Sequence, residues 1–185
     1  MATLEHGETS DLRLRPAMPS DAEWLKRWRD EWSVRRFQPL HDLSVPQLRS
    51  DVAAQRMRDL YRGRGDKFQW IIEEDAAPCG WITLVVSNWE HGLAEVGYAL
   101  ATAQQGRGLM TRALGMLVAD LFTQTGLERI EARCAIDNAA SKRVLEKAGF
   151  RHEGVLRSYF RLHGHRVDNH LYAILKEDWL AVGPL

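Results

Sequence analysis

The sequence lacks an excess of charge of either sign, since 25 Lys and Arg residues are matched by 25 Asp and Glu residues. Direct binding of nucleic acid driven by phosphate neutralisation needs a basic protein, so this balance argues against it. No stretch approaches the roughly 20 apolar residues of a membrane helix, and residues 1–11 contain no basic region followed by an apolar run. We therefore expect a cytoplasmic protein without a membrane segment or a signal peptide.

Cysteine is also scarce, because the chain has only Cys79 and Cys134, far apart and each within an apolar run. We interpret both as small buried side chains rather than as a disulfide or a metal pair. The histidines are scattered except in His163-Gly164-His165, which has no cysteine or carboxylate at ligand spacing. This tripeptide is more typical of a turn than of a metal site, and we expect no metal.

What is present is the composition of an ordinary globular protein: 45% of the 185 residues are apolar and 27% are charged. This length predicts a single domain, which we place at residues 11–180, and we interpret residues 1–10 as an N-terminal tail. Hydrophobic periods, caps and turn residues predict a mixed α/β fold with about seven strands around one sheet and about four helices. The expected strands cover residues 12–15, 68–73, 80–86, 94–100, 129–136, 150–162 and 167–175. The expected helices begin near residues 20, 44, 109 and 139 and include Trp32, Arg62, Leu121 and Ala148 respectively.

The most informative segment runs from Glu95 to Thr111, where a strand leads into a turn with Gly106 and Gly108 and then into an amphipathic helix. Glycines let a backbone approach a ligand closely, and a helix N-terminus offers unpaired N–H groups and a partial positive charge. Such a turn suits a phosphate, and Arg107 could add a charged fork, although a plain turn is the alternative. It is neither a Walker loop nor a good dinucleotide fingerprint, because the required lysine and third glycine are missing.

A second segment, from Cys134 to Ser141, contains the end of the expected strand 129–136 and the start of a helix after Asn138. The Asn138 amide can donate and accept hydrogen bonds, and Ser141 lies one turn further on the same face. Asn138 could serve only as the helix cap, and the two roles could coexist.

Together these segments resemble the GCN5-related N-acetyltransferase (GNAT) superfamily, and within it the RimJ/RimL branch that acetylates ribosomal-protein N-termini. The resemblance extends from about Leu12 to Trp179. It is carried by Gln105-x-x-Gly108, by Asn138-x-x-Ser141 with the block 144–150, and by Glu153-Gly154-x-Leu156-Arg157 with the later Asp168 and Leu171-Tyr172. It implies the GNAT fold, acetyl-CoA as the cosubstrate, and pairing as a homodimer, which many relatives form.

Two positions depart from the superfamily pattern. Met110 stands where Gly or Ala is usual, and Leu145 stands where many members have a general-acid tyrosine. The ribosomal-protein branch is similar at both positions, so the departures favour that branch. They also remove the usual proton donor and leave Ser141 as the favoured substitute.

The resemblance places acetyl-CoA where the strands 95–100 and 129–136 separate, and it implies direct attack by the acceptor amine without a covalent enzyme intermediate. Glu95 is the candidate base through a water, with Glu90 and His91 as weaker candidates; Glu95 could also be a solvated carboxylate at a strand end. Ser141 is expected to assist the departing CoA thiolate. The residues expected to bind the cosubstrate are Tyr98, Ala99, Leu100, Gln105, Gly106, Arg107, Gly108, Leu109, Met110, Thr111, Asn138 and Ser141.

The expected acceptor is a protein N-terminal α-amine, because this amine loses its proton far more readily than a lysine side chain. A small amine, such as a polyamine, an amino acid or an antibiotic, is the alternative, and a non-catalytic CoA-binding protein is a third reading. Trp24, Trp28 and Trp32 recur every four residues, which favours core packing, although by resemblance the first two helices also wall the acceptor cleft. The following Arg35 and Arg36 could be a solvated face or could attract an acidic acceptor.

Overall fold

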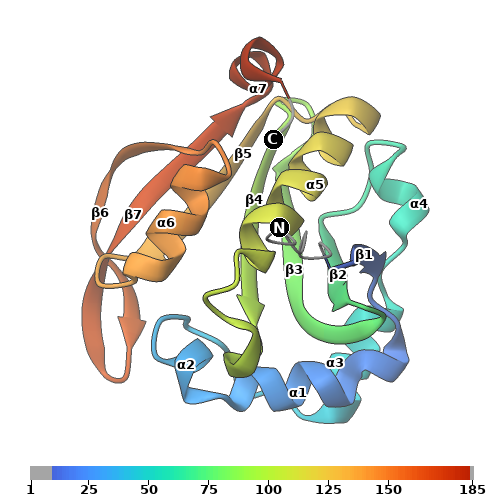
Figure 1. Ribbon diagram of the computed structural model, residues 1–185, viewed down its shortest axis with the longest axis vertical. Coiled ribbons are helices and arrows are strands. Elements are labelled where there is room, and N and C mark those ends of the chain that lie inside the picture. The colour runs from blue at the N-terminus through green and yellow to red at the C-terminus, as the bar shows by residue number, and fades with distance from the viewer. Residues whose placement is uncertain (1–9, 184–185) are drawn as a thin grey trace, which may run out of the picture.

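The computed structural model describes residues 10–183 and contains one seven-stranded sheet in the order β1-β2-β3-β4-β5-β7-β6 (Figure 1). All neighbouring strands are antiparallel except β4 and β5, which are parallel. The expected mixed α/β sheet is therefore confirmed, whereas residues 1–9 of the expected tail lie outside the described residues. The strands are β1 (Leu12–Pro16), β2 (Lys67–Glu74), β3 (Ala77–Asn88), β4 (Leu93–Leu100), β5 (Arg129–Ala135), β6 (Arg151–Leu162) and β7 (His165–Leu175).

The helices are more numerous than expected, because two of the expected helices are each divided and a C-terminal helix is added. None of the helices in residues 10–183 is long and apolar enough to cross a membrane. The α-helices are α1 (Ala22–Asp30), α2 (Trp32–Arg35), α3 (Val45–Ala53), α4 (Met57–Leu60), α5 (Leu109–Gln124), α6 (Ala139–Lys147) and α7 (Lys176–Val182), with short 3-10 turns at η1 (Pro19–Asp21) and η2 (Thr102–Gln104).

The expected tryptophan stripe on one helix is wrong. Glu31 has an extended backbone that separates α1 from α2, and its carboxylate accepts hydrogen bonds from the backbone N–H, at 2.7 Å, and the hydroxyl of Thr102. Of the three tryptophans in the expected stripe, only Trp28 is buried. Its ring stacks between those of Trp24 and Trp81, with ring centroids 5.9 and 6.2 Å away, while Trp32 is 65% exposed. A contact distant in sequence thus overrides the local helical period.

The second expected helix also breaks, between α3 and α4. The step from Val52 to Met57 is five residues, which a single helix cannot place on one face. Val52 packs with α1 on one side of the sheet, and Leu60 packs with α5 on the other side. The break therefore lets one segment contribute to both cores.

Two hydrophobic clusters cover the two faces of the sheet. The larger one joins α5 and α6 to the sheet, and the smaller one joins α1, α2 and α3 to Ile71, Trp81 and Ala99. In Figure 1, α5 and α6 lie in front of the sheet and α1 runs along its lower end. Cys79 and Cys134 are free and buried within the larger cluster, as expected for small apolar side chains.

Candidate active site

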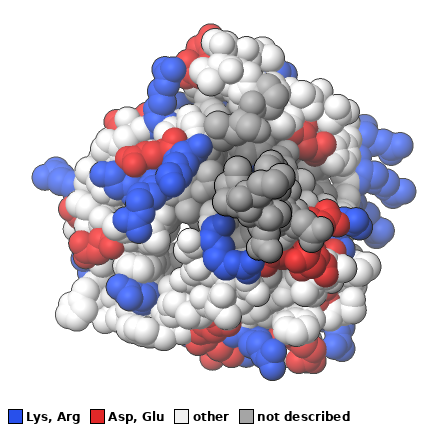
Figure 2. Space-filling model, in the orientation of Figure 1, with Lys and Arg blue, Asp and Glu red and all other residues white. Residues whose placement is uncertain are grey.

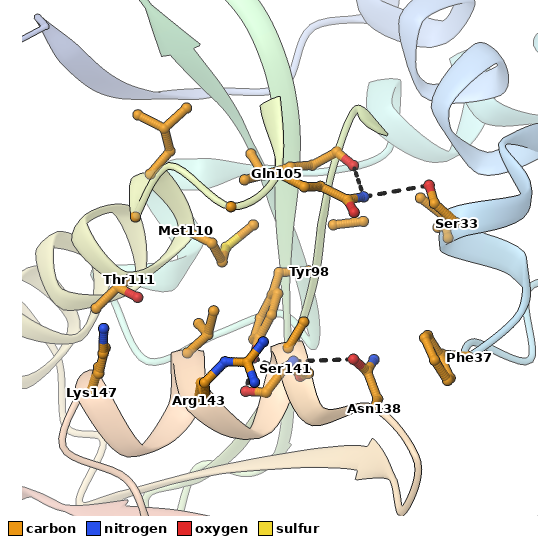
Figure 3. A pocket seen from close by; sticks show the side chains of 18 of the residues that line it. Ser33, Phe37, Tyr98, Gln105, Met110, Thr111, Asn138, Ser141, Arg143 and Lys147 are labelled. Carbon is orange, nitrogen blue, oxygen red and sulfur yellow. Dashed lines mark hydrogen bonds between the residues drawn. The ribbon is translucent and has the colours of Figure 1, made fainter. Parts of the chain in front are cut away.

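The site lies where β4 and β5 separate. These parallel strands pair only from Leu93↔Arg129 to Val96↔Ala132, although both continue beyond that point. The predicted separation of the strands is therefore present. It opens a cavity of about 280 Å³ between the C-terminal half of β4, the N-terminus of α5 and one face of α6 (Figure 3).

The glycine turn forms one wall of this first cavity. Gly106 and Gly108 have φ values of +79° and +78°, and an added Cβ at either would meet nothing within 4 Å. Gly108 is the N-cap of α5, so the unpaired N–H groups of that helix open onto the cavity. The predicted left-handed turn at a helix N-terminus is thus present, with the geometry that suits a phosphate.

Two side chains of the turn fix it to the rest of the fold. Gln105 Nε2 donates hydrogen bonds to the Leu100 carbonyl at 3.1 Å and to Ser33 Oγ at 3.4 Å (Figure 3). The Arg107 guanidinium binds the buried Glu74 carboxylate through both of its Nη atoms, at 2.6 and 2.8 Å. Arg107 alone among the residues expected to bind the cosubstrate does not line the first cavity, so its side chain holds the turn rather than projecting into the cavity as the expected fork.

The α6 N-terminus forms the opposite wall. Asn138 Oδ1 accepts a hydrogen bond from the Ser141 backbone N–H at 3.1 Å and so caps the helix, while both side chains also line the cavity. The Ser141 hydroxyl lies 2.9 Å from the Tyr98 hydroxyl, and the two are hydrogen-bonded. Burial raises the pKa of Tyr98, so this phenol holds its proton at neutral pH. The sequence did not indicate a role for the Tyr98 hydroxyl, because its partner lies 43 residues away in the chain.

A second cavity of about 180 Å³ adjoins the first. Phe37, Gln38, Tyr98, Asn138 and Ser141 line both cavities, so the Tyr98–Ser141 pair lies at their boundary. The second cavity is where an acceptor could meet a group that is held in the first.

Glu95 lines the second cavity and forms an ion pair with Arg133 of β5. Arg133 also bonds Glu131 at 3.1 Å and lies over the Tyr159 ring. Glu95 is therefore a paired carboxylate rather than a freely solvated strand end.

The weaker base candidates lie elsewhere. Glu90 and His91 belong to the exposed turn before β4 and line neither cavity. Cys134 lines the second cavity but is buried, and burial raises the pKa of its thiol to about 11. A neutral thiol is a poor nucleophile, which fits direct transfer without an enzyme-bound intermediate.

Two basic side chains of the first cavity were not predicted. Arg143 and Lys147 lie one turn apart on α6 and face the cavity across from Thr111 of α5 (Figure 3). In Figure 2, Lys and Arg side chains gather over this part of the molecule. Their spacing of four residues was the available signal, because it places the two cations on one face of the helix.

This arrangement fits an elongated phosphorylated cosubstrate. The helix N-terminus and the two cations suit phosphates. Tyr98 to Leu100 lie beyond the last β4–β5 pair, so this part of β4 has an edge that is not paired with β5. The second cavity adjoins the first at Tyr98. The carbonyls of Tyr98 and Leu100 accept from Gln38 and Gln105, so their N–H groups face the same edge. The fold and the site are thus those of a group-transfer enzyme with two adjoining cavities.

Comparisons with known proteins agree with this class. The family model described as "Acetyltransferase (GNAT) domain" matches residues 11–151. The uncharacterized N-acetyltransferase p20 of Bacillus licheniformis is 30% identical over 173 residues, which are 92% of this chain and 96% of that protein. The spermidine N(1)-acetyltransferase of Escherichia coli K12 is 25% identical over 92% of this chain and 89% of its own.

Among solved structures, Mycobacterium smegmatis RimJ in complex with CoA-disulfide superposes with a TM-score of 0.78 at 28% identity. The match covers 94% of this chain and 90% of that one. The chain belongs to the GNAT family and is an acetyl-CoA-dependent N-acetyltransferase, which confirms the resemblance seen in the sequence and sets aside a purely CoA-binding role.

Proposed function

We propose that the protein transfers the acetyl group of acetyl-CoA to the α-amine of a peptide or protein N-terminus. The observation that carries this proposal is the charge of the second cavity, whose one carboxylate, Glu95, is already paired with Arg133. A polyamine acceptor carries several ammonium groups, and each would need compensating negative charge. An α-amine needs only to lose one proton.

The protonation free energies favour the same acceptor. At pH 7 an α-amine of pKa about 8 loses its proton at a cost of about 1 kcal/mol, whereas a lysine-type amine of pKa about 10.4 requires nearly 5 kcal/mol. A single carboxylate acting through a water is sufficient for the first amine. Glu95 is assigned this role of proton acceptor.

Bound acetyl-CoA would supply an acetyl group activated as a thioester. The α5 N-terminus with Arg143 and Lys147 would hold its phosphates, and the unpaired edge of β4 would hold the chain that leads to the thioester. An N–H of Tyr98 or Leu100 on that edge can hydrogen-bond an oxygen that gains negative charge. Asn138 completes the wall beside this edge.

Ser141 is assigned the hydrogen bond to the departing sulfur. Its hydroxyl lies at the boundary of the two cavities and is hydrogen-bonded to a tyrosine that stays protonated. Tyr98 can therefore donate to Ser141 while Ser141 donates onward, which keeps the serine proton directed into the site. Many members of the superfamily have a general-acid tyrosine at the position that Leu145 occupies here. The Tyr98–Ser141 pair is assigned the role of that tyrosine.

The test is release of CoA thiol from acetyl-CoA with a panel of acceptors. We expect turnover with peptides that have a free N-terminus and none with the same peptides after their α-amine is blocked. Spermidine, free amino acids and aminoglycosides serve as the matched small amines. Turnover with small amines alone would reject the peptide acceptor. The cytoplasmic location and the homodimer stay separate predictions.

A further inference from the structure

The outer half of the β6–β7 hairpin carries an excess of positive charge. The segment 157–168 contains Arg157, Arg161 and Arg166 against one carboxylate, Asp168, whose Oδ1 accepts a hydrogen bond from the Ser158 backbone N–H at 2.7 Å. Arg161 and Arg166 are cross-strand partners, so two like charges face each other in the ladder. Such a pair is destabilising unless something of opposite charge comes near it.

The partners of these guanidinium groups leave the charge in place. Arg161 donates to the Gly164 carbonyl at 3.3 Å and Arg166 to the Ser158 carbonyl at 2.9 Å, and neither acceptor is an anion. Within residues 10–183, none of the three arginines forms an ion pair. By contrast, the arginines nearer the sheet centre, Arg129 and Arg133, are each paired with two carboxylates.

This end of the hairpin adjoins the second cavity, where the acceptor is proposed to bind. Phe160, the neighbour of Arg161 in the chain, lines that cavity. At the hairpin tip the His163 ring lies 5.0 Å from the exposed Trp32 ring of α2, and Figure 1 shows α2 and the β6–β7 turn at the same end of the molecule. On the α2 side, Arg36 lies over Phe37, which lines both cavities, with its guanidinium carbon 4.3 Å from the ring centroid. We call Arg36, Arg157, Arg161 and Arg166 the basic rim.

We propose that the acceptor is an acidic peptide or protein segment, whose carboxylates a few residues beyond the α-amine bind the basic rim. This inference rests on the proposed function, since it concerns the chain that follows the reacting amine. Charges within about 10 Å of one another interact across solvent at ordinary ionic strength, and Arg recognises carboxylates with a bidentate fork. The same rim repels a polycationic acceptor.

The experiment compares peptides with the same first residues followed by either Glu and Asp or their uncharged counterparts Gln and Asn. We expect kcat/KM to be about tenfold higher for the acidic peptide at low salt, and this preference to shrink as salt rises. The variant R161Q/R166Q should bring the acidic peptide close to the value of the neutral one. The matched control R58Q/R62Q removes the same charge from exposed positions in and after α4 and should keep the preference.

Three outcomes would overturn the inference. They are equal kcat/KM for the two peptides with the unmodified protein, a preference that survives in R161Q/R166Q, and RNA oligonucleotide binding that the rim variant loses without any acidic preference. The salt dependence of the unmodified protein needs no variant, so a misfolded hairpin cannot hide the answer. Peptides that react without regard to charge would reject this inference alone, whereas turnover of spermidine without any peptide would reject the proposed function itself.

Discussion

The hydrogen bond between Tyr98 and Ser141 gives the site its clearest single-residue hypothesis. A serine hydroxyl is a weak acid. It can assist a departing thiolate only if it donates its hydrogen bond to the sulfur and accepts one from a second donor. The partly buried Tyr98, with its raised pKa, provides such a donor at 2.9 Å. Neither residue needs a metal or a covalent step for this role.

Replacing Ser141 with alanine is expected to lower kcat by about 100-fold, the lower range for loss of a general acid, with little change in KM for acetyl-CoA. The Asn138 cap on α6 does not need the serine hydroxyl, because it binds the backbone N–H of residue 141. Steady-state kinetics with a free N-terminal peptide measure both constants. An unchanged kcat would remove Ser141 from the mechanism.

Cys134 provides the comparison within the same cavity. Its thiol is buried, its pKa is raised to about 11, and it is therefore protonated at neutral pH. Cys134→Ala should retain kcat within about threefold, because direct transfer gives this thiol no role. Loss of activity together with an acetylated cysteine in mass spectra of the unmodified protein would instead indicate a covalent route.

At the scale of elements, the junction between the glycine turn and α5 is where a single methyl group should affect both folding and cosubstrate binding. Gly108 has φ +78° and open space where a Cβ would go. Gly108→Ala should cost about 1–2 kcal/mol of folding free energy through backbone strain. It should also weaken CoA binding by tenfold or more, because the methyl group would occupy space that the phosphates need. Calorimetric titration of CoA measures this loss.

Gly164 supplies the matched control. It has φ +84° and equally open space, but it lies in the turn between β6 and β7. Gly164→Ala should cost a similar folding free energy and leave CoA affinity unchanged. Equal losses of affinity in the two variants would mean that strain, rather than position at the α5 N-terminus, weakens binding.

The elements themselves differ in how far local sequence could predict them. The strands and α5 follow their hydrophobic period and their glycine boundaries, and their predicted ends lie within a few residues of the observed ones. The two divided helices depart from their hydrophobic period. Glu31 interrupts the first because its carboxylate accepts a hydrogen bond from Thr102, and the second is interrupted because Val52 and Leu60 belong to cores on opposite faces of the sheet. Contacts of this kind link residues that no window of sequence contains together.

For the molecule as a whole, the parts of the site that depend on local sequence could be predicted, and the parts that depend on contacts between distant residues could not. The turn with Gly106 and Gly108 and the cap at Asn138 are read from short motifs, and both line the cavity. The Arg107–Glu74 pair and the Glu95–Arg133 pair join strands and turns 33 and 38 residues apart. Sequence spacing therefore predicts where a cosubstrate can lie, whereas the charges that line the second cavity come together only when the sheet is assembled.

The sheet and the N-terminal helices are joined by a partly buried ion-pair cluster around the buried Asp21. Arg15 of β1 binds both Asp21 carboxylate oxygens, at 2.7 and 2.8 Å, and Glu73 of β2 at 2.7 Å. Burial acts to raise the pKa of Asp21, but hydrogen bonds from Arg15 and from the Met18 backbone N–H outweigh it and hold that pKa below its usual value. Asp21 is only 4% exposed, so solvent screens this cluster weakly.

A group whose pKa is lowered by folding stabilises the protein above its unfolded pKa, here about 3.9, and this contribution is lost as pH falls through the folded value. Asp21→Asn should therefore cost about 3 kcal/mol in the free energy of unfolding at pH 7, and the difference from the unmodified protein should shrink below pH 4. Urea unfolding at several pH values measures it. Asp42→Asn, which removes one of the two exposed partners of Lys26, should not shift the unfolding midpoint measurably. A difference for Asp21→Asn that is the same at pH 3 and pH 7 would show that lost packing, rather than the ionised carboxylate, holds β1 to the N-terminal helices.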